Sequence, residues 1–115
     1  MSFHIATEKY EKSIKHAEKG LEIFRLIRDL QSEKSCLAII GEAYRCLGRV
    51  RKAVAFQNKA PQITQRIGDK RGEARCHNNL GKSCHFLGCN DESIAHYRKV
   101  LEISQAIGMR REEGI

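Results

Sequence analysis

The sequence repeats itself every 40 residues, and this period constrains the fold more than any other feature. When the chain is shifted by 40 positions, residues 28–67 fall on residues 68–107. Identical residues then coincide along the whole segment, among them Asp29/Asp69, Glu33/Glu73, Cys36/Cys76, Gly41/Gly81, Leu47/Leu87, Gly48/Gly88, Ile63/Ile103 and Ile67/Ile107. A period of this size is typical of arrays in which each repeat is one supersecondary unit.

Apolar residues inside each repeat recur three or four positions apart, which is the spacing of one helix face. We expect helices at about 6–27, 31–47, 50–66, 71–87 and 91–107, with a short stub from residue 109. Gly48, Gly68 and Gly88 follow helix ends, where glycine adopts a left-handed C-cap. Because the loops are short, neighbouring helices must be antiparallel. The pattern predicts an all-α solenoid of antiparallel helix pairs with about five helices.

The helices form one domain over residues 1–115 in this interpretation. An unpaired second helix at 6–27 precedes repeats at 28–67 and 68–107, and 108–115 begins a further repeat. Each repeat needs a neighbour to cover its apolar face. We therefore expect the chain to be a fragment of a longer array, or to cover its end helices by self-association.

Pro61 interrupts the helix expected at 50–66. A proline inside a helix removes the N–H that would bond the carbonyl of Gln57, and its ring clashes with that turn. The same helix begins with Arg49, Arg51 and Lys52, whose charges oppose the positive end of the helix dipole. We expect a kink near Pro61, either a tolerated surface irregularity or a hinge.

Charge and cysteine content bound the function. The net charge is +7, which favours acidic partners. The N-terminus has no apolar stretch typical of a signal peptide, and no window approaches the roughly 18 apolar residues of a membrane span. We therefore expect a reducing intracellular compartment for the five cysteines, an odd number. These features predict a cytoplasmic protein with no membrane partner.

The sequence offers no pattern for catalysis or for a cofactor. Cys76, His77, Cys84, His85 and Cys89 cluster along the chain but lack the short paired spacing of zinc ligands. We expect Cys84 and His77 in the core. Neighbours such as Cys84 and His85 point about 100° apart on a helix, so they do not form a nucleophile and base pair. We predict no enzyme, no metal site and no cofactor.

The repeats resemble the tetratricopeptide repeat (TPR) family over nearly the whole chain. Leu80-Gly81 and Ile40-Gly41 with Tyr44 stand at the signature positions of its first helix, and Ala53, Ala60 and Ser93 at small positions of its second. The segments Asn78-Asn79-Leu80-Gly81 and 67–70 are similar to a 40-residue subclass found in kinesin light chains and spindle-orientation adaptors. Cys84 replaces the signature tyrosine, and Ile39 stands where the other repeat has Asn79.

The resemblance implies a protein-interaction scaffold, or adaptor, whose first helices line a concave face that holds a peptide. By position, the partner-binding residues are Arg75, Asn78, Asn79, Lys82 and His85, with Ser35, Ala38, Glu42 and Arg45 from the earlier repeat. Cations outnumber anions in this set, so we expect an acidic protein or peptide. One alternative is a structural segment that stacks on further repeats or forms a homo-oligomer. Weak nucleic-acid binding is a third, disfavoured because no aromatic platform is evident.

Overall fold

The computed structural model describes the backbone of residues 3–112 and the side chains of residues 7–108. These residues form helices and short turns. The helices are α1 (Phe3–Leu26), α2 (Leu30–Cys46), α3 (Val50–Gln57), α4 (Ala60–Ile67), α5 (Lys70–Phe86) and α6 (Asn90–Glu112). The all-α fold class predicted from the repeat period is confirmed.

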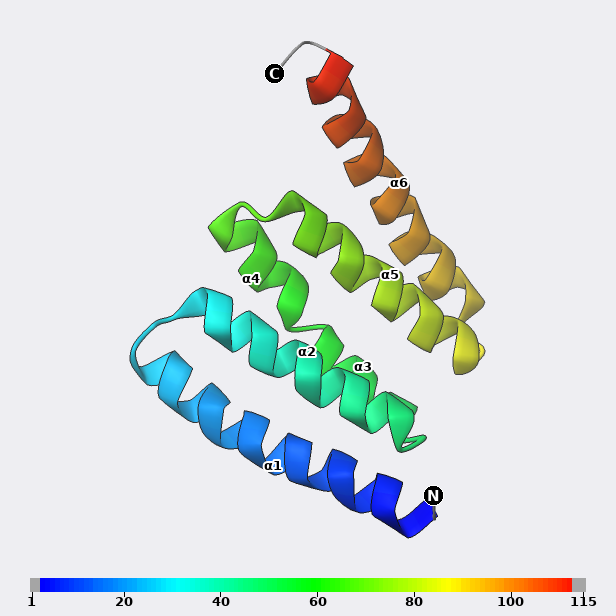
Figure 1. Cartoon of the computed structure of the whole chain (residues 1–115). Helices are drawn as coiled ribbons and strands as arrows, with labels where there is room; N and C mark the ends of the chain where they lie inside the picture. Colours follow the sequence, from blue (N-terminus) through cyan, green and yellow to red (C-terminus); the bar gives the residue numbers. More distant parts are fainter. Residues whose placement is uncertain (1–2, 113–115) are drawn as a thin grey trace.

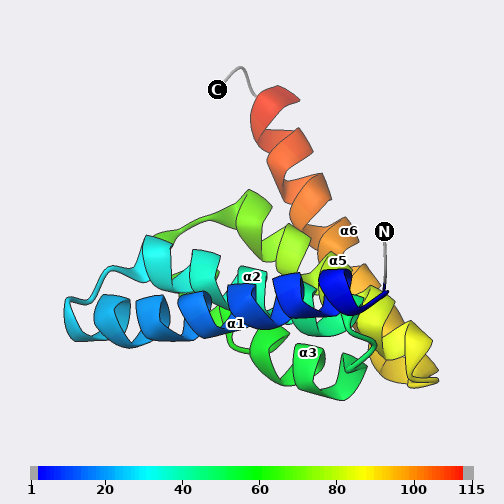
Figure 2. The same cartoon turned by 60° about the horizontal axis from the view of Figure 1, so that its bottom comes forward.

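α1 and α2 run antiparallel, as do α5 and α6, whereas α3 and α4 follow one another in the same general direction (Figure 1). α1 packs on α2, and α5 packs on α6. Between these pairs, α3 and α4 contact both α2 and α5. Consequently α1 and α6 lie at opposite ends, and the C-terminal part of α6 projects beyond the other helices in two views (Figures 1 and 2).

The core is built from the apolar stripes that the sequence predicts. Leu37 and Ile40 of α2 are completely buried, and Ile14 and Leu21 of α1 pack in the same cluster. In the second repeat Leu80 and Cys84 are buried, and so is His77. Truncating a residue such as Leu37 to alanine removes this packing, at a typical cost of about 2–5 kcal/mol.

The first helices of the two repeats start in the same way. Asp29 accepts a hydrogen bond from the backbone N–H of Ser32, and Asp69 accepts one from Gly72. Each carboxylate therefore satisfies an N–H group that the helix itself leaves unpaired. α2 and α5 each contain 17 residues and lie 40 positions apart.

Four helix-ending turns share one hydrogen-bond pattern. After α4, Gly68 N–H donates to Gln65 O at 3.3 Å and Asp69 N–H donates to Thr64 O at 2.8 Å. This pattern is the Schellman motif, which needs a left-handed residue at its turn. Gly68 supplies it with φ of 72°, whereas the turn after α1 uses Arg28 with φ of 58°.

Two helix boundaries differ from the sequence prediction. The segment expected as one helix at 50–66 is divided into α3 and α4 at Asn58 and Lys59, so that Pro61 lies in the first turn of α4. A proline is tolerated there because the first N–H groups of a helix have no intrahelical partner. A bend of the axis at this point remains a prediction.

The second difference concerns the expected stub from residue 109. α6 continues past Ile107 to Glu112, so the break expected at Gly108 is absent. At the position of Asp29 and Asp69, the next repeat would have Met109, which carries no oxygen to cap a new helix. The backbone therefore continues α6 through this point.

Candidate functional site

Two neighbouring pockets lie where α2 faces α5. One, of about 260 Å³, is lined by residues that include Ser35, Arg75 and Asn79. The other, of about 190 Å³, adds Glu42 and shares Ala38, Ala60, Cys76 and Asn79 with the first. We call this surface the α2–α5 groove, defined by Lys34, Ser35, Ala38, Glu42, Arg75, Cys76 and Asn79.

Helix periodicity explains why these side chains share a surface. Ser35, Ala38 and Glu42 lie three or four residues apart on α2, and Arg75 and Asn79 lie four apart on α5. The opposite faces of both helices are committed to the core through residues such as Leu37 and Leu80. A small residue at Ala38 leaves open the space that both pockets share.

The structure brings most of the sequence-predicted binding residues together. Ser35, Glu42, Arg75 and Asn79 line the α2–α5 groove. Arg45 and Lys82 line a third pocket of about 160 Å³, next to the ends of α2 and α5. Asn78 and His85 line none of these three pockets: the first is half-buried and the second is exposed on α5.

Sequence reasoning missed two groove residues. Cys76 is not among the predicted binding residues, yet it lines both pockets of the groove. Burial raises the pKa of its thiol, so the side chain stays protonated and acts as a small apolar surface. Lys34 lines the larger pocket as well. The sequence offered one signal for Lys34: it directly precedes Ser35, a predicted binding residue, and adjacent residues can border the same groove.

An ion pair closes one end of the groove. Lys34 Nζ donates to Asp69 Oδ2 at 2.7 Å. This hydrogen bond, aided by the N–H of Gly72, holds the pKa of Asp69 below its ordinary value. The charge of Lys34 is thus partly compensated within the protein.

A second ion pair lies further along α2. Arg45 Nε donates to Glu42 Oε2 at 3.2 Å. The Arg45 hydrogen bond lowers the pKa of Glu42, and the charge of Lys82 on α5 lowers it further. Glu42 is therefore an anion at neutral pH, and its charge compensates that of Arg45 more than that of Lys82.

Three groove and pocket side chains keep their bonding capacity. Arg75 and Lys82 are exposed and form no ion pair among the described residues. Asn79 is also exposed, and within the same part of the chain its amide makes no hydrogen bond. An amide offers both donors and an acceptor, and a guanidinium binds carboxylates in a forked geometry. This chemistry suits the backbone and the acidic side chains of a peptide.

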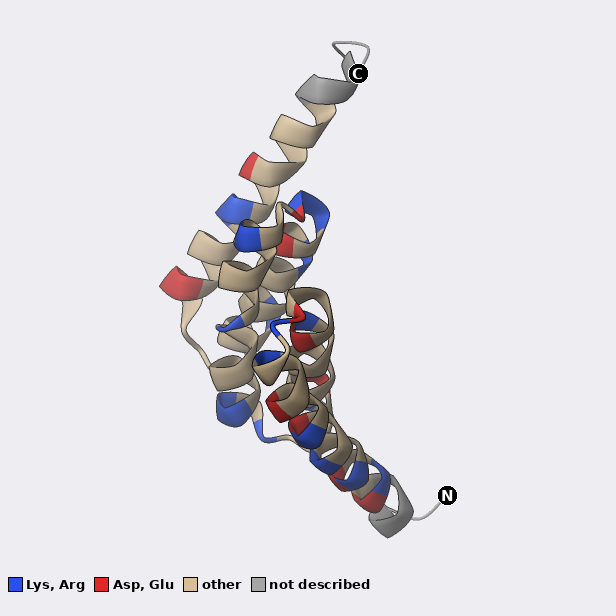
Figure 3. Ribbon diagram, turned by 90° about the vertical axis from the view of Figure 1, so that its left-hand side faces the viewer, with Lys and Arg blue, Asp and Glu red and all other residues tan. Residues whose placement is uncertain are grey.

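Basic residues are spread over several helices, with acidic residues among them (Figure 3). Both signs occur along the helix nearest the N-terminus in this view. Cations and anions are thus mixed along the helices in this view.

Outside the groove, two histidines meet between α5 and α6. His77 Nδ1 lies 3.0 Å from His96 Nδ1, so one ring must donate and the other accept. Burial is the largest cause that lowers both pKa values. Within residues 7–108, no group of three or more His, Cys, Asp or Glu side chains is arranged to hold a metal ion.

All five cysteines are free thiols. Among the helices that the structure describes, none is both long and apolar enough to cross a membrane.

Comparison with known proteins agrees with the helix-pair geometry. The sequence model of the tetratricopeptide repeat matches residues 33–106, which is more than half of the chain. A search of curated proteins gave no significant match. The matched segment spans nearly all of α2 and continues into α6, so it contains every groove residue defined above. From this match and the stacked helix pairs, the chain belongs to the tetratricopeptide repeat family.

Proposed function

We propose that this protein binds an acidic segment of another protein in the α2–α5 groove, which forms the concave face of the array. Tetratricopeptide repeats generally mediate protein–protein interactions. The observation that carries the finer proposal is the combination of two adjoining pockets with exposed Arg75 and Lys82, neither of which has an ion-pair partner among the described residues.

The charges around the groove support an acidic partner. Its anions, Glu42 and Asp69, already pair with Arg45 and Lys34. A carboxylate near Arg75 or Lys82 would meet a cation without displacing an existing ion pair, whereas a basic segment would meet uncompensated like charge. Complementary charge of this kind raises specificity and the association rate more than it raises affinity.

The proposal extends to residues at the margin of the groove. Asn78 and His85 contribute only if the partner extends beyond the pockets described above. We also place the chain in the 40-residue subclass of the family and in the cytoplasm, where five free cysteines remain reduced. The proposed role is that of a non-catalytic adaptor or scaffold.

Affinity capture from cell lysate tests this proposal. The test variant changes Arg75, Asn79 and Lys82 to alanine. The matched control changes Lys15, Gln62 and Arg66, two cations and one amide that are exposed on α1 and α4. We expect specific proteins, enriched in acidic segments, to bind the parent and the control but not the test variant. Equal capture by all three would rule out the groove.

The structure also supports a second candidate, a segment that stacks on further helices or on another copy. Ile94 and Leu101 of α6 are 50% and 62% exposed, whereas Ile14 and Leu21, their counterparts on α1, are buried against α2. Exposed apolar stripes of this kind commonly mark an interaction surface. Analytical ultracentrifugation tests this candidate, since Leu101→Glu would then dissociate any oligomer.

Weak nucleic-acid binding is the third candidate. Phosphate contacts release counterions, so such binding must fall steeply as salt rises. A titration of the protein with duplex RNA at two salt concentrations identifies it.

A further inference from the structure

Phe86, the last residue of α5, is exposed to an unusual degree for a phenylalanine. The residue is 74% exposed, although seven residues of the same helix are buried. The matching residue of the preceding repeat is Cys46, which is also exposed. The repeat architecture therefore places this position at the surface and does not require an aromatic residue there.

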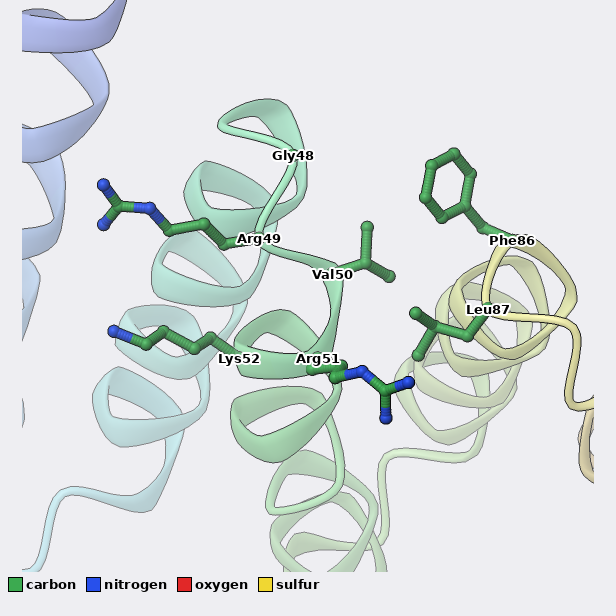
Figure 4. Close-up of a pocket in the computed structure, with 7 residues that line it drawn as sticks. All are labelled: Gly48, Arg49, Val50, Arg51, Lys52, Phe86 and Leu87. Atoms are coloured by element: carbon green, nitrogen blue, oxygen red, sulfur yellow. The ribbon is translucent and has the colours of Figure 1, made fainter.

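Phe86 borders two pockets. One, of about 280 Å³, lies between the start of α3 and the end of α5. Val50, Phe86 and Leu87 provide its apolar walls, and the side chains of Val50 and Leu87 point toward the space between the two helices (Figure 4). The other is the 160 Å³ pocket that Phe86 and Val50 share with Lys82. We call this surface the Phe86 cleft, defined by Val50, Arg51, Lys82, Phe86 and Leu87.

Five cations line the two pockets of the cleft, but their roles differ, and Arg45 is already paired with Glu42. Arg49 extends toward α1, where its Nη2 lies 3.9 Å from Glu11 Oε1. Lys52 Nζ lies 5.6 Å from the centre of the Tyr44 ring. Both point away from Phe86 (Figure 4). Arg51, in contrast, points to the Leu87 side of the cleft and forms no ion pair among the described residues.

Lys82 lines the smaller pocket together with Phe86 and also lacks an ion-pair partner in the described part of the chain. Each of the two pockets that Phe86 borders thus contains a cation with no ion-pair partner among the described residues, Arg51 in the larger pocket and Lys82 in the smaller one. The start of α3 adds to the positive potential, because Arg49 at its N-cap forms no side-chain capping bond.

We propose that the Phe86 cleft receives one bulky apolar side chain of the acidic segment, flanked by carboxylates that approach Lys82 and Arg51. The inference rests on the proposed function, since Arg45 and Lys82 connect the cleft with the residues of the α2–α5 groove. The volume of the larger pocket falls below the roughly 300 Å³ at which small-molecule sites begin, so a single side chain suits it. Interfaces typically gain most of their affinity from a few such apolar anchors surrounded by polar contacts.

The test uses synthetic nonapeptides and fluorescence anisotropy with the full chain. The probe consists of aspartate and glutamate with a central phenylalanine. One control peptide has alanine at the centre, and a second keeps phenylalanine but replaces the acids by their amides. We expect the probe to bind at least about tenfold more tightly than either control, because it alone supplies both the anchor and the charges.

Variants locate the binding. Phe86→Ala should remove the roughly tenfold advantage of the probe over the alanine-centred peptide, and Arg51→Ala should weaken the probe several-fold. Cys46→Ala, at the matching position of the other repeat, and Arg66→Ala, an exposed cation of α4, should change nothing. Because Phe86 is exposed, its truncation should leave the helical circular dichroism and the unfolding midpoint unchanged.

Distinct outcomes overturn the inference and the proposed function. If the alanine-centred peptide binds through Arg75 and Asn79 but phenylalanine adds nothing, the Phe86 cleft is wrong and the groove stands. If the phenylalanine probe keeps its affinity advantage in Phe86→Ala, or if no peptide binds, the proposal for the Phe86 cleft is also wrong. The capture from lysate then decides alone whether the α2–α5 groove binds a partner. If Phe86→Ala abolishes self-association and leaves peptide binding intact, a second copy occupies the cleft instead.

Discussion

Lys34 and Asp69 join the first helices of the two repeats through a hydrogen bond of 2.7 Å. Lys34 belongs to α2, and Asp69 is the N-cap residue of α5. The same carboxylate accepts the backbone N–H of Gly72 at 2.9 Å. One side chain therefore both starts a helix and fixes it against its neighbour at the edge of the α2–α5 groove.

Substitutions at Asp69 separate these two roles. Asp69→Ala should lower the free energy of unfolding by roughly 1–2 kcal/mol, because the cap and the Lys34 contact are both lost. Asp69→Asn should cost less than about 1 kcal/mol, since asparagine caps equally well. Urea unfolding measures both. Equal losses from the two substitutions would mean that the ion pair contributes more than the cap. Asp29→Ala serves for comparison, because it removes a cap that has no lysine partner.

Replacing Arg28 by glycine should stabilise the protein. Arg28 has φ of 58° in the turn after α1, at the position that Gly68 occupies after α4. A left-handed conformation costs a non-glycine residue roughly 1 kcal/mol, so Arg28→Gly should raise the free energy of unfolding by up to that amount. Gly68→Ala is the opposite change and should lower it similarly. A loss of stability in Arg28→Gly contradicts the prediction.

A buried hydrogen bond between Ser83 and Gln57 links α5 to α3. Ser83 Oγ donates to Gln57 Oε1 at 2.9 Å, and both side chains are buried. Ser83→Ala leaves that oxygen without a partner, which should cost about 1–2 kcal/mol. Gln57→Met in the same chain should recover part of the loss, because it removes the unpaired group. Additive effects in this double-mutant cycle would show that the bond contributes nothing.

The histidine pair should make stability depend on pH. The pKa values of His77 and His96 are lowered in the folded protein, chiefly by burial, so the unfolded chain binds protons more readily. The nearby charge of Lys99 also lowers the pKa of His77, and that of Glu73 opposes the shift. The stabilisation is complete above the ordinary value of 6.5 and decreases as pH falls below it.

Unfolding measured between about pH 8 and pH 5 checks this prediction. His77→Leu should flatten the decline, because only one titrating ring then remains in the contact. His16→Leu, an exposed site on α1, is the control and should leave the slope unchanged. An identical slope in all three proteins would assign the pH dependence to other groups.

Much of the fold was predictable because it follows from local periodicity. The spacing of Leu37, Ile40 and Leu80 indicates helix faces directed to a core, and all three residues are buried. Asp29 and Asp69 lie at matching positions of the repeat and cap matching helices. Such features depend on residues close in the chain, so the sequence determined the all-α class, the repeat period and the turns at Gly48, Gly68 and Gly88.

The tertiary structure decided what lies between helices. Cys76 lines the groove, and Phe86 forms the cleft with Val50, which precedes it by 36 positions. These neighbours depend on how α3 and α5 pack, and helical spacing does not report the rotation of one helix against another. The division of the segment at Asn58 also needed the structure. A proline fits either a kinked helix or the first turn of a new one, and the local sequence does not distinguish the two.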